Sequence, residues 1–190
     1  SEALDDSEPS IDLVSISGFK TAGAVKIDNE IITYTGISTL TLTGCTRGTN
    51  STSAAAHDSG AAATQVLINP IATANNSAVV TITDTSHGAQ GGDWVVLSGA
   101  AATGGVAADD LNRMSGYQVT VLTANTYTIT VPTAATSTVS AGGGVTMVIS
   151  YLIGNTAGLG SQSASPALGF GVGGWGDSTW GTARSTSDAT

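Results

Sequence analysis

The pattern of hydrophobic and polar positions predicts a chain built mainly of short β-strands. Val25 and Ile27 alternate with polar neighbours, and after a two-residue corner the alternation resumes at Ile32 and Tyr34. A period of two on both sides of a tight corner is typical of a hairpin with one buried face. A third strand, in which threonines separate leucines, follows at once. The stretch from residue 18 to residue 60 therefore indicates a scaffold of strands.

The same pattern continues through the rest of the chain as far as residue 153. It predicts further strands over residues 65–68, 79–82, 94–97, 117–121 and 127–131. One short helical turn is expected within residues 106–113. The last predicted strand is long and places on one face Val145, Met147, Ile149, Tyr151 and Ile153.

These elements predict an all-β protein with two small antiparallel β-sandwich or barrel-like modules. Pro70 is the expected boundary, because proline cannot donate a hydrogen bond to a strand ladder. We divide the chain into an acidic arm that is either solvated or extends to another subunit (1–10), an N-terminal β module (11–69), a second β module (70–153) and a docking tail rich in Gly, Ser and Trp (154–190). A flexible linker is the alternative interpretation of the tail.

The composition favours assembly with other chains. Only 10% of the 190 residues are charged and 5% are aromatic, so each module has a thin core. Small residues allow close approach of neighbouring chains, and we expect part of the buried area to lie between subunits of a homo-oligomer. The net charge of −9, with five scattered basic residues, argues against a nucleic-acid partner. No apolar run is long enough to cross a bilayer.

Few residues suggest chemistry. Asp84, Ser86 and His87 are the residue types of a hydrolase triad, but triads are assembled from separated segments, and three neighbours fit a capped loop better. His57 and Asp58 have the same interpretation. We therefore expect no catalytic residue.

No metal or cofactor site is expected either. Two histidines and the single Cys45 do not supply a close-spaced zinc ligand set. Cys45 is expected to be a small buried hydrophobe. Asp109 and Asp110 fit a helix N-terminal cap better than a calcium loop. The glycines of residues 169–174 resemble a phosphate loop only superficially, because no helical pattern follows them.

The tail contains aromatic residues that cannot form a core of their own. Phe170, Trp175 and Trp180 stand among glycines and small polar residues. They would be exposed to water unless they pack on the body of the chain or on another chain, and we predict a contact with another subunit, with stacking on a sugar ring as the alternative. The first residue is Ser1, so the chain could be a processed product or a piece of a longer protein.

Several strings of residues resemble modules of virion structural and tail proteins of tailed bacteriophages. In the first half these are residues 23–36 (GAVKIDNEIITYTG), 42–50 (LTGCTRGTN) and 54–57 (AAAH). In the second half they are residues 79–83 (VVTIT), 87–100 (HGAQGGDWVVLSGA), 105–112 (GVAADDLN), 125–131 (NTYTITV) and 175–181 (WGDSTWG).

The resemblance implies a non-enzymatic structural protein of the virion, most simply a homo-oligomeric tail or fibre component. It transfers no catalytic residue. Expected partners are other copies of the chain and other virion proteins. A capsid decoration protein is the closest alternative, and an adhesin module that binds host-surface glycan through Trp175, Trp180 or the loop around Asp109 is another. An enzyme that degrades polysaccharide would need a pair of carboxylates, which the sequence does not offer.

Overall fold

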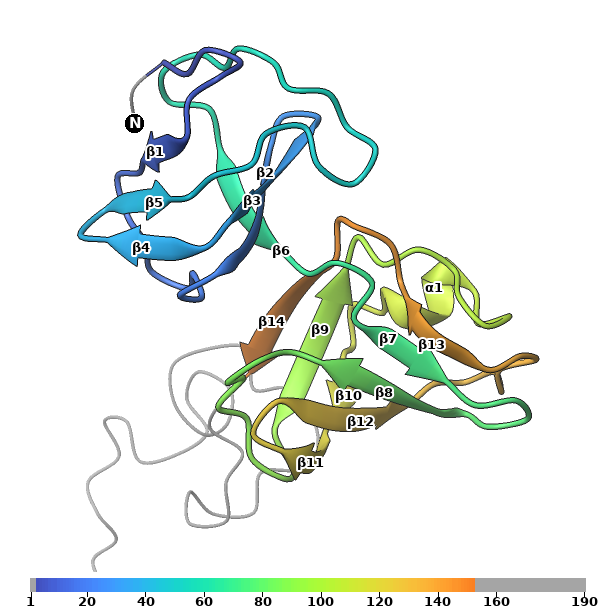
Figure 1. Ribbon diagram of the computed structural model, residues 1–190. Coiled ribbons are helices and arrows are strands. Elements are labelled where there is room, and N and C mark those ends of the chain that lie inside the picture. Colours follow the sequence, from blue (N-terminus) through green and yellow to red (C-terminus); the bar gives the residue numbers. More distant parts are fainter. Residues whose placement is uncertain (1–2, 153–190) are drawn as a thin grey trace, which may run out of the picture.

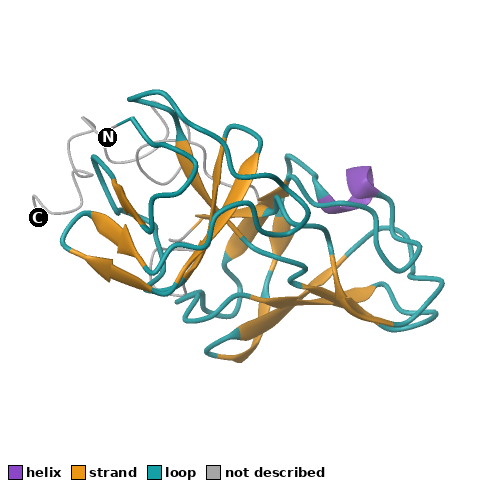
Figure 2. Cartoon of the chain, turned by 45° about the horizontal axis from the view of Figure 1, so that its top comes forward, coloured by secondary structure: helices purple, strands orange, loops and turns teal. Residues whose placement is uncertain are grey.

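The computed structural model describes residues 3–152 and confirms an antiparallel all-β fold (Figures 1 and 2). The strands form four small sheets, and every strand pair is antiparallel. Within the described residues the one helix is α1 (Ala108–Leu111), a single turn in the region where the sequence predicts it. No helix in this part of the chain has the length and apolar character to cross a membrane.

The N-terminal strand group contains two three-stranded sheets, one in the order β1-β5-β4 and one in the order β3-β2-β6. Its strands are β1 (Ser10–Asp12), β2 (Gly23–Ile27), β3 (Glu30–Tyr34), β4 (Gly36–Ser38), β5 (Thr41–Thr43) and β6 (Ala63–Val66). The predicted hairpin is β2–β3, and Asp28 at its corner has a positive φ of 49°. Aspartate tolerates this conformation better than most residues, which suits it to the corner.

The C-terminal strand group contains a five-stranded sheet in the order β11-β12-β8-β7-β13 and a three-stranded sheet in the order β10-β9-β14. Its strands are β7 (Ile71–Thr73), β8 (Val79–Thr83), β9 (Trp94–Ser98), β10 (Tyr117–Gln118), β11 (Thr120–Thr123), β12 (Thr126–Thr130), β13 (Val139–Gly142) and β14 (Val148–Leu152). Figure 1 shows β14 beside β9, the strand with which it pairs.

Each strand group has its own hydrophobic core. The N-terminal core consists of Leu4, Ile11, Leu13, Val25, Ile27, Ile32, Tyr34 and Leu42. The larger C-terminal core has sixteen buried members, drawn from both sheets of its group, and includes Ile82, Leu97, Leu111, Tyr127, Ile129 and Met147. Burial of these side chains supplies the main driving force for folding each group.

A third, smaller cluster joins the two groups. Ala24, Ile31 and Val66 are buried on the outer face of the β3-β2-β6 sheet, opposite the N-terminal core. They pack together with Ile68, Val145 and Val148 from the segment between the groups and from the C-terminal group. Strands β2 and β3 are thus buried on both faces at these positions, whereas their alternating pattern predicts burial of one face only.

Two predicted strands differ in the structure. The strand expected over residues 145–153 begins only at Val148, because Val145 turns toward the third cluster while the Met147 carbonyl accepts a hydrogen bond from the Leu67 amide at 2.8 Å. The strand expected over residues 117–121 changes sheets at Val119, whose backbone bonds to Gly92 and Asp93 instead. Ile153 lies outside the described residues.

The acidic arm also differs from the expectation of a solvated extension. Leu4 is 6% exposed and joins the N-terminal core. Its backbone amide and carbonyl both bond to the backbone of His57, at 2.9 Å each. Residues 5–7 are exposed, but Ser10 already belongs to β1. From Leu4 onward the arm is therefore attached to the first core by both apolar burial and backbone pairing.

Candidate functional site

The densest group of charged side chains lies inside the N-terminal strand group and centres on Glu30. The Glu30 carboxylate is held in a bidentate ion pair with Arg47, whose Nε lies 2.9 Å from Oε1 and whose Nη2 lies 2.8 Å from Oε2. The backbone amides of Gly48 and Ala55 donate to the same carboxylate at 2.7 and 3.2 Å. Glu30 is 1% exposed, so the pair is almost completely removed from solvent.

Local structure places these residues together. Glu30 is the first residue of β3, directly after the hairpin corner, and the segment from residue 44 to residue 57 wraps back over it. Gly48 has a positive φ of 59°, and a Cβ there would lie 2.5 Å from the backbone nitrogen of Ala54. Only glycine satisfies both conditions, which explains its place after Arg47.

His57 completes this group from the other end of the same segment. Its Nε2 lies 2.8 Å from Oε2 of Glu30, and its Nδ1 lies 2.8 Å from Oδ2 of Asp28. Ionised carboxylates can only accept hydrogen bonds, so both contacts form together only when both ring nitrogens carry a proton. Arg47 also donates to the backbone carbonyls of Asp5 and Ala55, which ties the N-terminal arm to the group.

The electrostatics of this group fit a structural role. Burial would raise the pKa of Glu30, but the hydrogen bonds from Arg47 and His57 outweigh it and lower the pKa to about 2. A carboxylate with five donors and so low a pKa is poorly suited to receive a proton near neutrality. The arrangement binds the hairpin, the wrapping segment and the arm to one another.

Cys45 lies next to this group without joining it. It is partly buried and packs against the N-terminal core, as expected, and its Sγ lies 3.6 Å from the carbonyl oxygen of Leu42. Burial raises the pKa of the Cys45 thiol, which keeps it in the less reactive protonated form.

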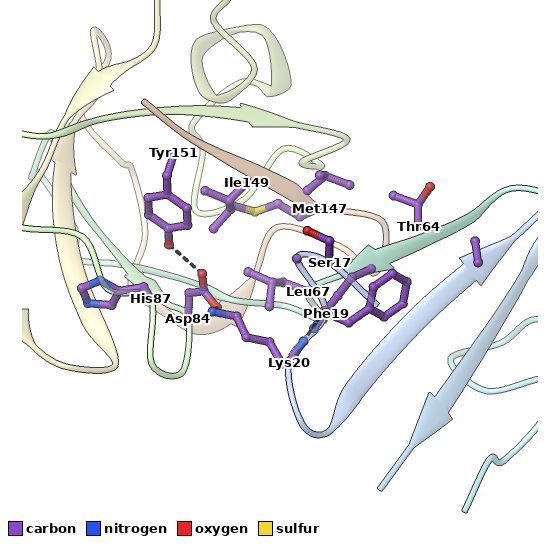
Figure 3. A pocket seen from close by; sticks show the side chains of 14 residues that line it. Ser17, Phe19, Lys20, Thr64, Leu67, Asp84, His87, Met147, Ile149 and Tyr151 are labelled. Carbon is purple, nitrogen blue, oxygen red and sulfur yellow. Dashed lines mark hydrogen bonds and ion pairs between the residues drawn. The ribbon is translucent and has the colours of Figure 1, made fainter. Parts of the chain in front are cut away.

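A second group of polar side chains lies in a cleft between the two strand groups (Figure 3). Asp84 is 3% exposed, and its Oδ1 lies 3.2 Å from Nζ of Lys20, which comes from the N-terminal group. Tyr151 donates its hydroxyl to Oδ2 of Asp84 at 2.6 Å. Burial, with the neighbouring Tyr127 and Asp84, raises the pKa of Tyr151. The ion pair and this hydrogen bond connect a loop of the first group with β14 of the second.

The three triad-like residues are not arranged as a triad. His87 is 7% exposed; its Nε2 lies 3.0 Å from the carbonyl oxygen of Thr123, and its Nδ1 accepts from the amide of Ala89 at 3.0 Å. Both ring nitrogens are therefore engaged by backbone groups. Ser86 has a positive φ of 53° and donates its amide to the side chain of Asn125. The capped loop that the sequence predicts describes Ser86 well, while Asp84 belongs to the cleft.

The remaining candidates are placed as follows. Asp109 and Asp110 lie in the first turn of α1, but the N-cap residue is Ala107 and makes no side-chain cap hydrogen bond, so the expected capping role is wrong. Within residues 3–152 no group of three or more His, Cys, Asp and Glu side chains could hold a metal ion. The tail residues Phe170, Trp175 and Trp180 lie outside the described residues.

Sequence reasoning missed Glu30 and Lys20 as the partners of these groups. Glu30 carried a usable signal, because it is a carboxylate at the start of a strand that contains Ile31, Ile32 and Tyr34, in a chain with only five basic residues. A buried carboxylate needs a cation, and Arg47, among glycine and threonine, was an available one. Lys20 lies in a loop with no pattern that could have pointed to Asp84, sixty-four positions away.

No protein-family model and no curated protein match this sequence. Among solved structures, one that resembles the chain is the phage phi92 endosialidase, with a TM-score of 0.37 and 16% sequence identity. The resemblance covers 74% of this chain and 20% of that chain. This chain therefore corresponds to about a fifth of the length of the protein it matches, at a level below that which establishes a common fold.

Proposed function

We propose that this protein is a non-enzymatic structural component of a tailed-bacteriophage virion, namely a tail or fibre component that assembles as a homo-oligomer. Its role would be mechanical: two small β modules form a scaffold that packs against neighbouring subunits. The proposal places the protein in the extracellular particle.

The proposal rests on the positions that the residue strings resembling bacteriophage modules occupy in the fold. The strings at residues 23–36, 42–50 and 54–57 contain Glu30, Arg47 and His57, which form the buried charged group. The charged residues within these strings are thus the ones that attach the β2–β3 hairpin to the segment of residues 44–57. This is what a structural motif requires, since its residues must specify a shape and need not contact a substrate.

The second set of strings has a similar position. Residues 79–83, 94–98 and 126–130 are strands β8, β9 and β12, and residues 105–112 include α1. These elements supply much of the C-terminal core, which supports a scaffold role for this half as well.

Exposed apolar side chains support assembly. Val14 is 82% exposed, Met114 is 88% exposed and Leu122 is 56% exposed. In a chain of which only 10% of the residues are charged, such side chains are suited to contacts between subunits. Light scattering of the purified chain measures the oligomeric state directly, and a monomer at high concentration would contradict the homo-oligomer.

The position in the particle is tested by labelling virions with an antibody against this chain and viewing them by electron microscopy. We expect the antibody label on the tail or its fibres. Label over the capsid would replace this proposal with a decoration protein, and the absence of label from intact and opened particles would refute a virion role. Binding to a glycan array that Trp175→Ala abolishes would instead support an adhesin.

A further inference from the structure

The cleft between the two strand groups has a volume of about 480 Å³ and lies between two sheet edges. One wall includes residues Ala63–Gln65 of β6, and the other includes Val148, Ile149 and Tyr151 of β14. Within the described residues β6 pairs only with β2, and β14 pairs only with β9. The cleft is therefore flanked by strand edges on which an extended segment of chain could lie.

The side chains that line the cleft are mainly apolar. Phe19, Leu67, Met147 and Ile149 form the apolar lining, and the ring of Tyr151 stands beside them (Figure 3). Asp84 is covered, whereas the side chain of Lys20 remains 30% exposed. A complementary occupant is thus largely aromatic or aliphatic and has at most a small negative charge.

We propose that this cleft receives residues 169–181 of the same chain. The described part of the chain ends at Leu152, directly after Tyr151 in the cleft wall, so the remaining residues begin at the cleft itself. The intervening residues 153–168 can span up to about 50 Å when extended, which is ample for a return to the cleft.

The composition of residues 169–181 matches the cleft. Phe170, Trp175 and Trp180 provide aromatic rings, and the glycines between them allow the backbone to approach a strand edge closely. Asp177 is the one charged residue of the segment and is complementary to Lys20. An indole ring is also a favourable partner for the Lys20 ammonium. This inference does not depend on the position of the protein in a virion.

The docking is tested in the full chain by quenching of indole fluorescence. The background is Cys45→Ser with Trp94→Phe, which leaves Trp175 and Trp180 as reporters. Trp94→Phe is a suitable change, because the Trp94 Nε1 is buried and has no hydrogen-bond acceptor among the described residues. A nitroxide label is attached at Thr64→Cys, an exposed position in the cleft wall, or at Met114→Cys, an exposed position in the loop after α1.

We expect the label at position 64 to quench most of the indole emission and the label at position 114 to leave it nearly unchanged. The quenching should not depend on protein concentration. Equal quenching at both positions would overturn the proposal. Quenching at position 64 that disappears on dilution would also overturn it, since the occupant would then be the segment of a second copy.

Hydrogen exchange provides a second test that needs no label in the cleft. Replacement of Phe170, Trp175 and Trp180 by Ser should speed amide exchange in peptides that cover residues 63–68 and 148–152 about tenfold or more, and leave peptides from β8 and β12 unchanged. Unchanged exchange along both cleft walls would refute docking there. Immunolabelling of virions is unaffected by either result, so failure of this inference is distinguishable from failure of the proposed function.

Discussion

Arg47 donates two hydrogen bonds, of 2.9 and 2.8 Å, to the carboxylate of Glu30, although the two residues are 17 positions apart and lie on different segments. Their side chains are 7% and 1% exposed. A bidentate geometry of this kind orients both partners as well as attracting them. It fixes the wrapping segment against the start of β3, and the consequences of losing it can be measured.

Glu30→Gln should destabilise the protein strongly. The substitution keeps the shape of the side chain but leaves the buried Arg47 cation without its counter-charge, and breaking one partner of a buried pair costs about 3 kcal/mol or more. Urea denaturation followed by circular dichroism measures the change in the free energy of unfolding. Asp6→Asn removes the same charge from an exposed position and should alter that free energy by less than about 0.5 kcal/mol. Equal effects of the two substitutions would contradict the structural role of the pair.

Low pH should lower the free energy of unfolding, because the buried Glu30 carboxylate becomes protonated. The folded-state pKa of this carboxyl is about 2, below its ordinary value of 4.5. A group whose pKa is lowered by folding stabilises the protein above its unfolded pKa, and the contribution disappears as the pH falls from about 4.5 to about 2. The difference corresponds to about 3 kcal/mol. Unfolding free energies measured across this window should fall more steeply for the wild type than for Glu30→Gln, and parallel curves would argue against the assignment.

At alkaline pH the protein should unfold, and its buried tyrosines should ionise only as it does so. Burial raises the pKa of all four tyrosines above the ordinary 10, and that of Tyr34 reaches about 12. Because the unfolded chain ionises first, stability should fall as the pH rises above 10. Absorbance of tyrosinate near pH 11 should therefore appear together with the loss of strand circular dichroism. Ionisation of all four tyrosines near pH 10 in a chain that remains folded would contradict their burial.

Gly48→Ala should cost about 2 kcal/mol or more. The residue occupies a left-handed backbone conformation, and the added methyl group would lie 2.5 Å from the backbone nitrogen of Ala54. The backbone movement needed to accommodate this methyl group would also displace the Gly48 amide, which donates to Glu30. Gly91→Ala is the matched control, since a Cβ at Gly91 meets no atom within 4 Å among the described residues. Thermal unfolding of the two variants measures the contrast, and similar melting temperatures would show that the wrapping segment can shift.

Much of the fold could be predicted from period-two alternation. The β2–β3 hairpin appears as alternating residue types in its sequence, and β8, β9 and β12 also bury alternate residues in the structure. Strands β7 and β13 were missed because three or four residues are too few to show a period. The burial of Ala24 and Ile31 could not be foreseen, since it depends on the third cluster, whose other members come from distant parts of the chain.

The polar groups were predictable only in part. The sequence pattern indicates a capped loop at His57 and leaves Arg47 as one of five scattered basic residues, and its spacing does not reveal that both converge on Glu30. That convergence depends on the path of the wrapping segment, including the positive φ at Gly48. The cleft was not foreseen, because its walls come from strands about eighty positions apart.

The linker between the two strand groups is bonded to the chain that returns past it. The Leu67 amide donates to the Met147 carbonyl at 2.8 Å, and the Asn69 amide donates to the Gly144 carbonyl at 2.7 Å. Bending the protein at this joint therefore requires two backbone hydrogen bonds to break and the third cluster to open. A torque applied to one strand group would therefore be transmitted to the other, because two segments of chain connect them at this joint. Two groups joined by a single unpaired linker would rotate freely relative to each other.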